Sequence, residues 1–413
     1  MMNSVAATSV DSYDFDEVTS SILILLDVLG QPLKRMITSE SKVVIKPNWV
    51  SHRNLSGHTL NAVITHPTLI RAMVRIVSVL NPASIVVADT PQYDCDFSKI
   101  LSYSSFGGVD ALDLRDYWSR GKHFASELIK LPGDPAGKEE VDLGEKSYLS
   151  GIDMSKVYGA RYNRAETRRA HSNGHHRYEL SRTMTEADVL ISMPKMKTHK
   201  KVGVTLNVKG LVGISTNKNL IPHYRLGPPS EGGDQYPDGL FTEQEEALIR
   251  LERWLYDQLL ASGNKVTETI HHKIYDFHNR ITKRFFQIDP EKRKLDTGNW
   301  YGNDTCWRSA ADLYQILRQK NIQTFSLIDG IVGGEGDGPL APTEKAAKLL
   351  VAGEDMLATD LAAISLMGFN YKKIPLYWRL AIDYPSHYHL LFPQTCAERS
   401  REFIPHRGWE GHI

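Results

Sequence analysis

The residues best equipped for chemistry follow a short apolar run near the middle of the chain. Val189 to Ser192 reads as a buried strand, and it breaks at Pro194 into a polar motif. That motif holds Lys195, Lys197, Thr198, His199, Lys200, Lys201, Asn207 and Lys209. A strand that delivers cations at its carboxyl end is where an open α/β sheet usually binds an anionic ligand. The alternative interpretation is a solvated basic loop.

Three other apolar runs also end in polar residues. The runs and the residues that end them are Val43–Ile45 with Lys46 and Asn48, Ser84–Ala88 with Asp89 and Thr90, and Thr324–Ile328 with Asp329. Because the carboxyl ends of parallel strands lie on one edge of a sheet, we expect these residues to converge there. The mixture of bases and acids suits an anionic substrate held beside a divalent cation. The alternative is that each is an ordinary strand terminator.

A glycine-rich motif from Asp329 to Pro339 supplies further carboxylates. Five glycines surround Asp329, Glu335 and Asp337 in a spacing that matches neither a Walker loop nor a dinucleotide fingerprint. Carboxylate oxygens are ligands for Mg²⁺ or Mn²⁺ more than for Zn²⁺. We therefore predict a divalent metal bound by Asp89, Asp329, Glu335 and Asp337. A tight turn that uses Asp and Gly for their backbone conformations is the alternative.

The same motifs provide candidate catalytic and substrate-binding groups. His199 is placed to move a proton, and Lys195 or Lys197 can act as a base or form a Schiff base if desolvated. The predicted substrate-binding residues are Lys46, Asn48, Asn207, Lys209, His223 and Arg308. Arg308 lies four residues before Asp312, so pairing between these two is its simplest structural role.

The elements that must position these residues predict an α/β fold. Val43–Ile45, a helix that begins at Pro67 behind a cap at Thr65 or His66, and Ser84–Ala88 form a βαβ unit. A further strand at Lys348–Ala352 and a helix at Leu357–Met367 follow late in the chain. We expect a mostly parallel, doubly wound sheet with helical and loop insertions.

The chain divides by composition into core segments and insertions. The predicted core segments are residues 1–91, 188–213 and 301–375. Between them lie a polar insertion at 92–187 and, at 214–300, a long loop over 214–240 followed by helices that Gly263-Asn264 divides. Residues 376–413 form a C-terminal tail.

The amino-acid composition limits the kinds of partner that we expect for the protein. The 413 residues hold 49 Lys plus Arg and 49 Asp plus Glu, a formal net charge of zero that favours neither nucleic acid nor a membrane surface. Cys95, Cys306 and Cys396 fit no zinc, iron–sulfur or disulfide spacing. We expect a cytoplasmic protein that acts on a small anionic metabolite.

Several motifs in order resemble a known family, the bacterial and archaeal proteins of domain of unknown function 362. They are KVVIKPN, THP, VVADTP, MPKMKTH with TLNVKG, GNDTCWR, DGIVGGEGDGP and VAGEDMLATDLAAISLMGF, over roughly residues 40–100 and 185–375. The resemblance implies an intracellular α/β protein, without an agreed activity. It implies recurrent polar positions at Lys46, Asn48, Asp89, Lys195, Lys197, His199, Lys209, Asp329, Glu335, Asp337 and Asp360. Some relatives carry a ferredoxin-like cysteine module that this chain lacks, so no iron–sulfur cluster is expected.

Two functions from different classes fit these residues. The first is a metal-dependent enzyme acting on a phosphorylated or carboxylated metabolite, by group transfer or hydrolysis rather than isomerisation. The second is a non-catalytic carrier or maturation factor that binds a metal or a phosphate-bearing cofactor. An ordered 214–240 loop closing over His199 or His223 would favour catalysis.

Overall fold

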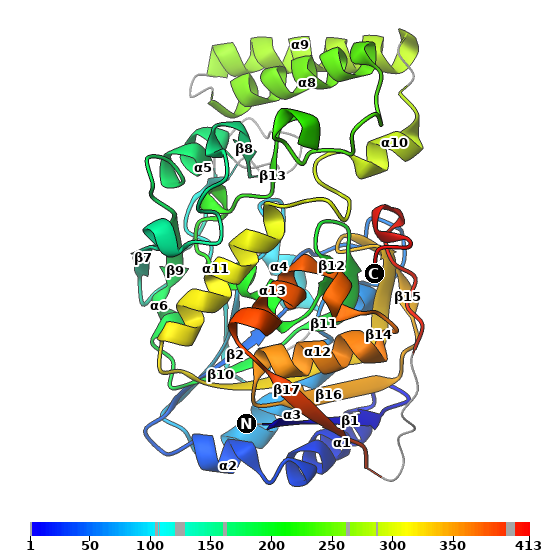
Figure 1. Cartoon of the computed structure of the whole chain (residues 1–413). Coiled ribbons are helices and arrows are strands. Elements are labelled where there is room, and N and C mark those ends of the chain that lie inside the picture. The colour runs from blue at the N-terminus through cyan, green and yellow to red at the C-terminus, as the bar shows by residue number, and fades with distance from the viewer. Residues whose placement is uncertain are drawn as a thin grey trace.

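A large mixed sheet forms the centre of the molecule (Figure 1). The computed structural model describes residues 2–103, 106, 108–119, 129–159, 163–261, 265–285, 288–393 and 401–413. The eleven strands are β1 (Met2–Ser9), β2 (Lys42–Pro47), β3 (Ser84–Asp89), β4 (Asp110–Asp113), β10 (Val189–Met193), β11 (Lys195–His199), β12 (Gly203–Thr205), β14 (Gln323–Asp337), β15 (Ala341–Lys345), β16 (Leu349–Gly353) and β17 (His387–Leu391). The main path runs in the order β17-β1-β16-β14-β10-β2-β3-β4.

The strands that end in the candidate site residues are parallel. β14, β10, β2, β3 and β4 pair in parallel along the main path, so their carboxyl ends share one edge. Helix α3 (Pro67–Ser78) connects β2 to β3, with His66 as its N-cap and Pro67 in its first turn. The predicted βαβ unit and the predicted α/β class, with a mostly parallel sheet, are confirmed.

Helices cover both faces of the sheet because the strands are apolar on both faces. Val43 and Ile45 of β2 pack on the side of α1 (Phe15–Val28) and α3. Val44, between them, packs on the side of α11 (Cys306–Gln319), α12 (Met356–Leu366) and α13 (Pro375–Asp383). Neighbouring residues of a strand point to opposite faces, so one short run contributes to two cores.

Two strands differ from the sequence-based prediction. The glycine-rich motif is not a turn after Ile328, because β14 continues unbroken to Asp337. The basic motif is not a loop either, since Lys195–His199 forms β11, which pairs with β14 in parallel and with β12 antiparallel. The charged side chains therefore lie on strands, which hold them more rigidly than a loop would.

Beyond β14 the sheet contains antiparallel as well as parallel pairs. β16, the strand predicted at 348–352, runs antiparallel to both β14 and β1, and β15 folds back on the end of β14. β17 comes from the predicted C-terminal tail and pairs with β1 in parallel. The first and last parts of the chain thus complete the same sheet.

The segment predicted as a polar insertion contributes to this sheet through β4 and otherwise forms small elements. They include β5 (Trp118–Ser119), β6 (Ile129–Lys130), β7 (Lys138–Asp142), β8 (Val157–Tyr158), α5 (Arg164–Ala170), β9 (Arg177–Ser181) and α6 (Arg182–Thr185). β5 pairs with β6, and β7 pairs with β9. The 214–240 loop is ordered, and its strand β13 (Tyr224–Arg225) pairs with β8.

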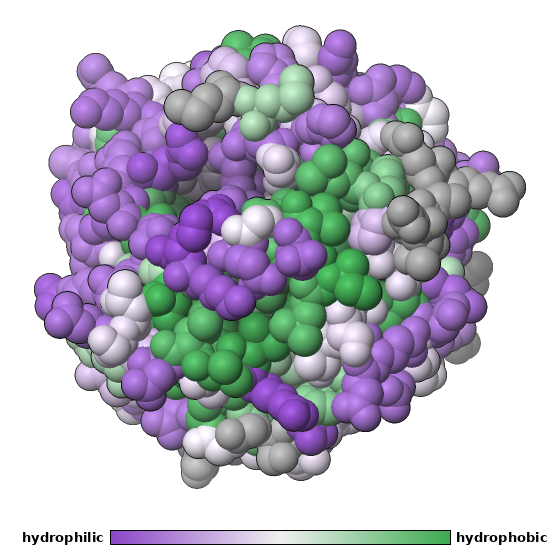
Figure 2. Space-filling model, turned by 90° about the horizontal axis from the view of Figure 1, so that it is seen from below, coloured by the Kyte–Doolittle hydropathy of each residue, from purple (hydrophilic) through white to green (hydrophobic). Residues whose placement is uncertain are grey.

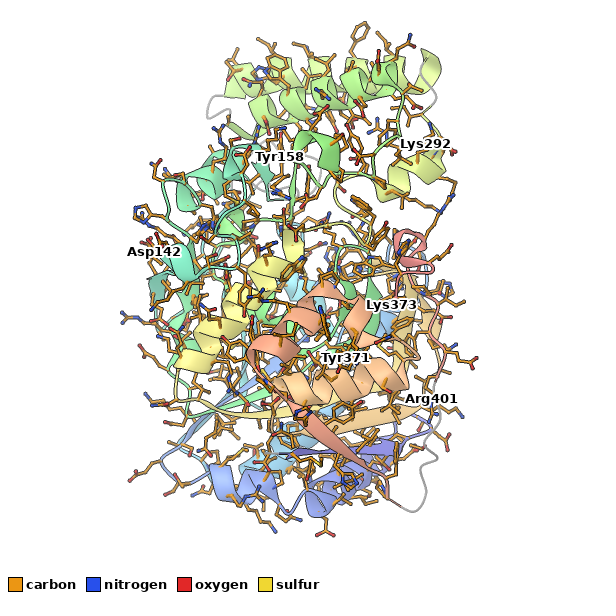
Figure 3. The ribbon with its side chains drawn as sticks, in the orientation of Figure 1. Asp142, Tyr158, Lys292, Tyr371, Lys373 and Arg401 are labelled. Carbon is orange, nitrogen blue, oxygen red and sulfur yellow. The ribbon has the colours of Figure 1, made fainter. Side chains whose placement is uncertain are left out.

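A helical hairpin projects from the end of the molecule opposite α1 (Figure 1). It consists of α8 (Glu243–Ala261) and α9 (Lys265–Phe285), and the predicted divider Gly263-Asn264 lies outside the described residues. Tyr158 and Lys292, labelled in Figure 3, lie beneath it. The Tyr158 hydroxyl donates to the carbonyl of Arg253 at 3.4 Å, and Lys292 of α10 (Pro290–Leu295) pairs with Glu245 at 3.1 Å.

The opposite end of the molecule carries α1 on its surface. Figure 2 shows this face from below, with apolar residues gathered across it. Leu23, Ile24 and Val28 of α1 contribute exposed side chains. Within the described part of the chain, no helix is long and apolar enough to cross a membrane.

Candidate functional site

A buried ion pair joins the carboxyl ends of β2 and β3. Nζ of Lys46, at the end of β2, donates to Oδ1 of Asp89 at 2.9 Å, and both side chains are buried. The second carboxylate oxygen of Asp89 accepts the backbone N–H of Trp49 at 2.7 Å. The convergence of β2 and β3 at one edge, predicted from sequence, is therefore observed directly in this contact.

A second buried ion pair joins the first residue of β11 to the middle of β14. Nζ of Lys195 donates to Oδ2 of Asp329 at 2.5 Å, and both side chains are inaccessible to solvent. Asp329 also accepts the Tyr13 hydroxyl at 2.8 Å and the backbone N–H of His66 at 2.9 Å. The ring of Tyr13 stacks on His66 with centroids 3.7 Å apart. Both oxygens of Asp329 are thus occupied by protein donors.

Lys197 is buried beside this pair and has no carboxylate partner among the described residues. Its Nζ donates to Oδ1 of Asn48 at 2.7 Å and to the carbonyl of Val63. Gly334 of β14 makes room for it, because a β-carbon at Gly334 would lie 3.0 Å from that of Lys197. The pKa of Lys197 is lowered well below its ordinary value by burial and then by the charges of Lys195 and Lys209.

Lys209 is held by a short helix whose start is fixed by a buried carboxylate. Helix α7 (Asn207–Gly210) presents its first N–H groups to Asp360 of α12, which accepts from Asn207 N at 2.9 Å and Val208 N at 2.8 Å. Asp360 also accepts Nδ2 of Asn207 at 2.7 Å and the Tyr377 hydroxyl at 3.2 Å. Burial raises the pKa of Asp360 to about 7.

Within the described chain, Nζ of Lys209 forms no hydrogen bond or ion pair, although the residue is only 7% exposed. Burial lowers the pKa of Lys209. The charge of Lys209 in turn lowers the pKa values of several neighbours, namely Lys197, His199, Lys218 and His223. Lys209 is therefore close enough to these four side chains for its charge to act on them.

Two more lysines in the same region donate to carbonyls, and neither forms an ion pair within the part of the chain that the structure describes. Nζ of Lys201 donates to the carbonyl of Thr297 and lies 5.3 Å from the ring centre of Tyr224. Nζ of Lys218 donates to the carbonyl of Val212. Burial is the first cause that lowers both pKa values, that of Lys201 to about 7 and that of Lys218 well below its ordinary value.

We call Lys197, Lys201, Lys209 and Lys218 the lysine cluster. All four are more than nine-tenths buried, and none forms an ion pair with a carboxylate in the described residues. An ionised side chain removed from water costs several kcal/mol unless a counter-charge stabilises it. The arrangement can lower this cost by losing protons or by binding an anion.

The two histidines of the site hold complementary tautomers. Nδ1 of His199 accepts the backbone N–H of Lys201 at 3.1 Å, so the neutral ring carries its hydrogen on Nε2. Nδ1 of His223 lies 2.8 Å from the carbonyl of Ile221, so this ring carries its hydrogen on Nδ1. Burial lowers both pKa values, that of His223 to about 3. The neutral His199 ring thus carries a hydrogen-bond donor at Nε2, whereas the neutral His223 ring carries its unprotonated nitrogen there.

The four carboxylates predicted to bind a metal are dispersed over separate contacts. Asp89 and Asp329 form the two ion pairs with lysine, Glu335 lies 3.5 Å from Lys345, and Asp337 lies 3.6 Å from His406. Among the residues that the structure describes, no group of three His, Cys, Asp or Glu side chains is arranged to hold a metal ion. The metal site stays a prediction without support from these contacts.

Arg308 makes a different contact from the expected one. It pairs with Asp304 at 2.9 Å and donates to the carbonyl of Tyr148 at 2.7 Å. Asp312 instead accepts from Ser147, Tyr178 and the backbone of Tyr148. The simple pairing of Arg308 with Asp312 is therefore wrong, because the side chain of Arg308 extends toward the start of α11.

The sequence interpretation missed two contributors to the site. Lys218 lies in the predicted long loop over 214–240, and Tyr13 comes from the N-terminal segment. No local pattern marks Tyr13, because its role depends on a contact with Asp329, 316 residues away. Lys218 stands between two asparagines, without a neighbouring acid to neutralise it.

Fold and site together define an α/β protein with a buried cationic site at the carboxyl edge of its sheet. Residues 142–365, more than half of the chain, match the family described as Domain of unknown function (DUF362), and the chain belongs to this family. This confirms the resemblance found in the motifs.

Other comparisons add little. No curated protein matches the chain. One solved structure, of a protein from Thermotoga maritima, is 11% identical with a TM-score of 0.36 over 86% of this chain. The match covers 58% of that protein, so this chain spans less than two thirds of its length.

Proposed function

We propose that the protein is an enzyme that binds a small anionic metabolite, phosphorylated or carboxylated, at the lysine cluster. The observation that carries the proposal is the burial of Lys209 without any hydrogen bond or ion pair in the described chain. Buried charges in proteins are normally paired. An anionic ligand would supply the missing counter-charge to Lys209 and to its three neighbours.

The chemistry proposed for this site is group transfer or hydrolysis, with isomerisation less favoured. Lys197 has a lowered pKa and can act as a base or a nucleophile once neutral. Nε2–H of His199 can donate to a leaving group or a developing anion. Lys195, by contrast, is held by Asp329, so its proposed role is positioning.

Metal dependence is the part of this proposal to test separately. A Mg²⁺ or Mn²⁺ ion at Asp89 or Asp329 would have to displace a lysine from its ion pair. If the metal takes part, turnover should need added Mg²⁺ or Mn²⁺ and stop on chelation. Turnover that persists in the presence of a chelator would exclude the metal from the proposal and would leave the proposed anion site standing.

A carrier or maturation factor is the second candidate function. The order of the 214–240 loop, in which Lys218 and His223 lie close to Lys209, favours a closed site suited to catalysis. A carrier would bind and release its ligand unchanged.

The test is to identify the small anion that co-purifies with the protein, by denaturing the purified chain and analysing the released molecules by mass spectrometry. We expect an anion in the wild-type protein that is absent from Lys209→Met and present in Lys373→Met. Lys373 is an exposed lysine, labelled in Figure 3, and serves as the matched control.

The identified anion is then incubated with the wild-type protein and with His199→Gln. Conversion by the wild type and not by the variant supports the enzyme. Bound but unconverted ligand, with or without Mg²⁺, supports the carrier. Equal anion content in the Lys209→Met and Lys373→Met proteins would place the ligand elsewhere.

A further inference from the structure

The lysine cluster has many unused hydrogen-bond donors. Each ammonium group carries three N–H donors. Lys197 donates to two acceptors, Lys201 and Lys218 to one each, and Lys209 to none within the described residues. A ligand that matches this supply must offer several acceptor oxygens and more than one negative charge.

Neutral polar atoms around the cluster are also without partners. Oγ1 of Thr205, Oγ1 of Thr90 and Oδ1 of Asn207 are buried and have no hydrogen bond in the described structure. Thr205 stands directly opposite Lys197 in the β11–β12 ladder, so the two side chains lie on the same face. Thr90 follows Asp89 at the end of β3, and Asn207 begins the helix that carries Lys209.

These atoms are further indications of a ligand. A buried hydroxyl without a partner loses the hydrogen bonds that it makes with water. The hydroxyls of Thr90 and Thr205 can donate to an anion, and Oδ1 of Asn207 can accept from a lysine or from a ligand hydroxyl. The unpaired atoms and the unpaired cations occur in the same strand ends and the same short helix.

The cations of this site that are left for a ligand are lysines. Arginine binds carboxylate and phosphate alike through two parallel hydrogen bonds, whereas lysine binds phosphate as a point charge. Two arginines are buried among the described residues, and both face carboxylates. Arg115 is occupied by Asp113 at 2.6 Å and by the carbonyls of Gln92 and Cys95, and Arg225 lies 3.7 Å from Asp234. The groups left for a ligand are therefore lysines and hydroxyls.

We propose that the ligand of this site carries a phosphoryl group with two negative charges, bound by Lys197, Lys209 and the hydroxyl of Thr205. The inference rests on the proposed function and narrows its substrate class from anions in general to phosphorylated metabolites. A phosphoryl group carries about 1.5 to 2 negative charges at neutral pH and offers three acceptor oxygens. A single carboxylate offers one charge and two oxygens.

The test compares four anions as ligands of the purified full chain, at equal ionic strength. Inorganic phosphate and pyrophosphate represent the phosphoryl class, malonate is the dicarboxylate control, and acetate is the monocarboxylate control. Thermal unfolding and titration calorimetry give the shift in Tm and the Kd. We expect phosphate and pyrophosphate to raise Tm and to bind at least about tenfold more tightly than malonate, with acetate weaker still.

Two variants and a control connect binding to the site. Lys209→Met should weaken pyrophosphate binding by about ten- to a hundredfold, the cost of one charged hydrogen bond. It should also raise the Tm of the ligand-free protein, because methionine removes a buried charge without a partner. Thr205→Val, which keeps the shape of the side chain, should weaken the binding of phosphate and leave the binding of acetate unchanged. Lys373→Met should change neither Kd nor Tm.

The outcomes separate this inference from the function on which it rests. If malonate binds as tightly as pyrophosphate and Lys209→Met loses both, the proposal of a phosphoryl ligand is wrong and the proposal of an anion site is retained. No binding of any of the four anions by the folded wild-type protein would overturn both. If both Lys209→Met and Thr205→Val still bind phosphate like the wild type, phosphate binds elsewhere on the protein and the inference is wrong.

Discussion

At the scale of single residues, the site contains two kinds of buried lysine. Lys46 and Lys195 have carboxylate partners at 2.9 and 2.5 Å, and the lysine cluster has none in the described chain. The paired lysines fix strand ends relative to each other, whereas the cluster leaves charge to be neutralised. The sequence does not distinguish the paired lysines from the lysine cluster, because lysines of both kinds follow apolar runs.

Breaking the Asp329 pair should therefore be costly. Asp329→Asn leaves Lys195 buried without a counter-charge, and removal of one partner of a buried pair costs about 3–5 kcal/mol in the free energy of unfolding. The double variant Asp329→Asn with Lys195→Met should regain part of that loss, since it buries no lone charge. Urea denaturation measures both.

The matched control is Asp337→Asn, on the same strand with its side chain 47% exposed. It should change stability little, because burial lowers the pKa of its partner His406 to about 4 and the ring is therefore neutral near pH 7. A small loss for Asp329→Asn, equal to that of the control, would show that Lys195 is not held as an ion pair.

At the scale of elements, short helices place the site against the sheet. The turn η4 (Leu211–Ile214) follows α7 and lies directly on the first ion pair, because a β-carbon at Gly213 would overlap Oδ1 of Asp89 and lie 2.5 Å from Nζ of Lys46. The carbonyl of Gly213 also accepts the N–H of Thr90 at 3.2 Å. Glycine is needed here for close approach.

Gly213→Ala should consequently push η4 away from the ends of β2 and β3. Overpacking of this kind costs about 1–3 kcal/mol, and the displacement should also weaken anion binding at Lys209. Gly210→Ala, in the adjacent helix, is the control, because a β-carbon there meets nothing within 4 Å. Thermal melts with and without phosphate measure both effects. Equal stability of the two variants would contradict the contact.

The elements also show where prediction from sequence succeeds and fails. β2, β3 and β10 were found because both of their faces are buried, which makes their sequences continuously apolar. β11 and the second half of β14 were missed because lysines and glycines are typical of loops. Their pairing depends on partners over a hundred residues away, such as Lys195 with Asp329.

The same limit applies to the site. Lys46, Lys197, Lys209 and His199 could be selected because residues at carboxyl ends of parallel strands converge. The sequence could not predict that the carboxylates form separate ion pairs, because this depends on which lysine each carboxylate contacts in the fold. The metal prediction assumed that Asp89 and Asp329 face an open site.

At the scale of the whole molecule, an overall formal charge of zero conceals an uneven distribution. The interior concentrates cations at one edge of the sheet, so protonation there is coupled to folding and to ligand binding. Burial, followed by the charge of Lys200, lowers the pKa of Lys201 to about 7 in the folded protein from 10.5. Between these two pH values the unfolded chain binds more protons than the folded chain, so stability rises with pH across that window.

Lys201→Met should remove this dependence. We expect the variant to be more stable than the wild type by roughly 5 kcal/mol below about pH 7, with the difference shrinking to zero as pH approaches 10.5. Urea denaturation at several pH values gives the difference directly. Lys373→Met is again the control, and its curve should follow the wild type. Parallel curves for Lys201→Met and wild type would mean that Lys201 is solvated.

Anion binding should draw protons into the same site. Sulfate is a suitable probe, because it is a tetrahedral dianion that does not itself titrate near neutrality. At about pH 8.5 Lys201 is mostly neutral in the free protein, and a bound dianion raises its pKa, so binding should take up protons; at about pH 6 Lys201 is already charged and adds no uptake. Calorimetry in buffers of different ionisation enthalpy measures the uptake, which should fall at the higher pH in Lys201→Met. Sulfate that binds without proton uptake at the higher pH would show that Lys201 is already charged there or lies away from the anion.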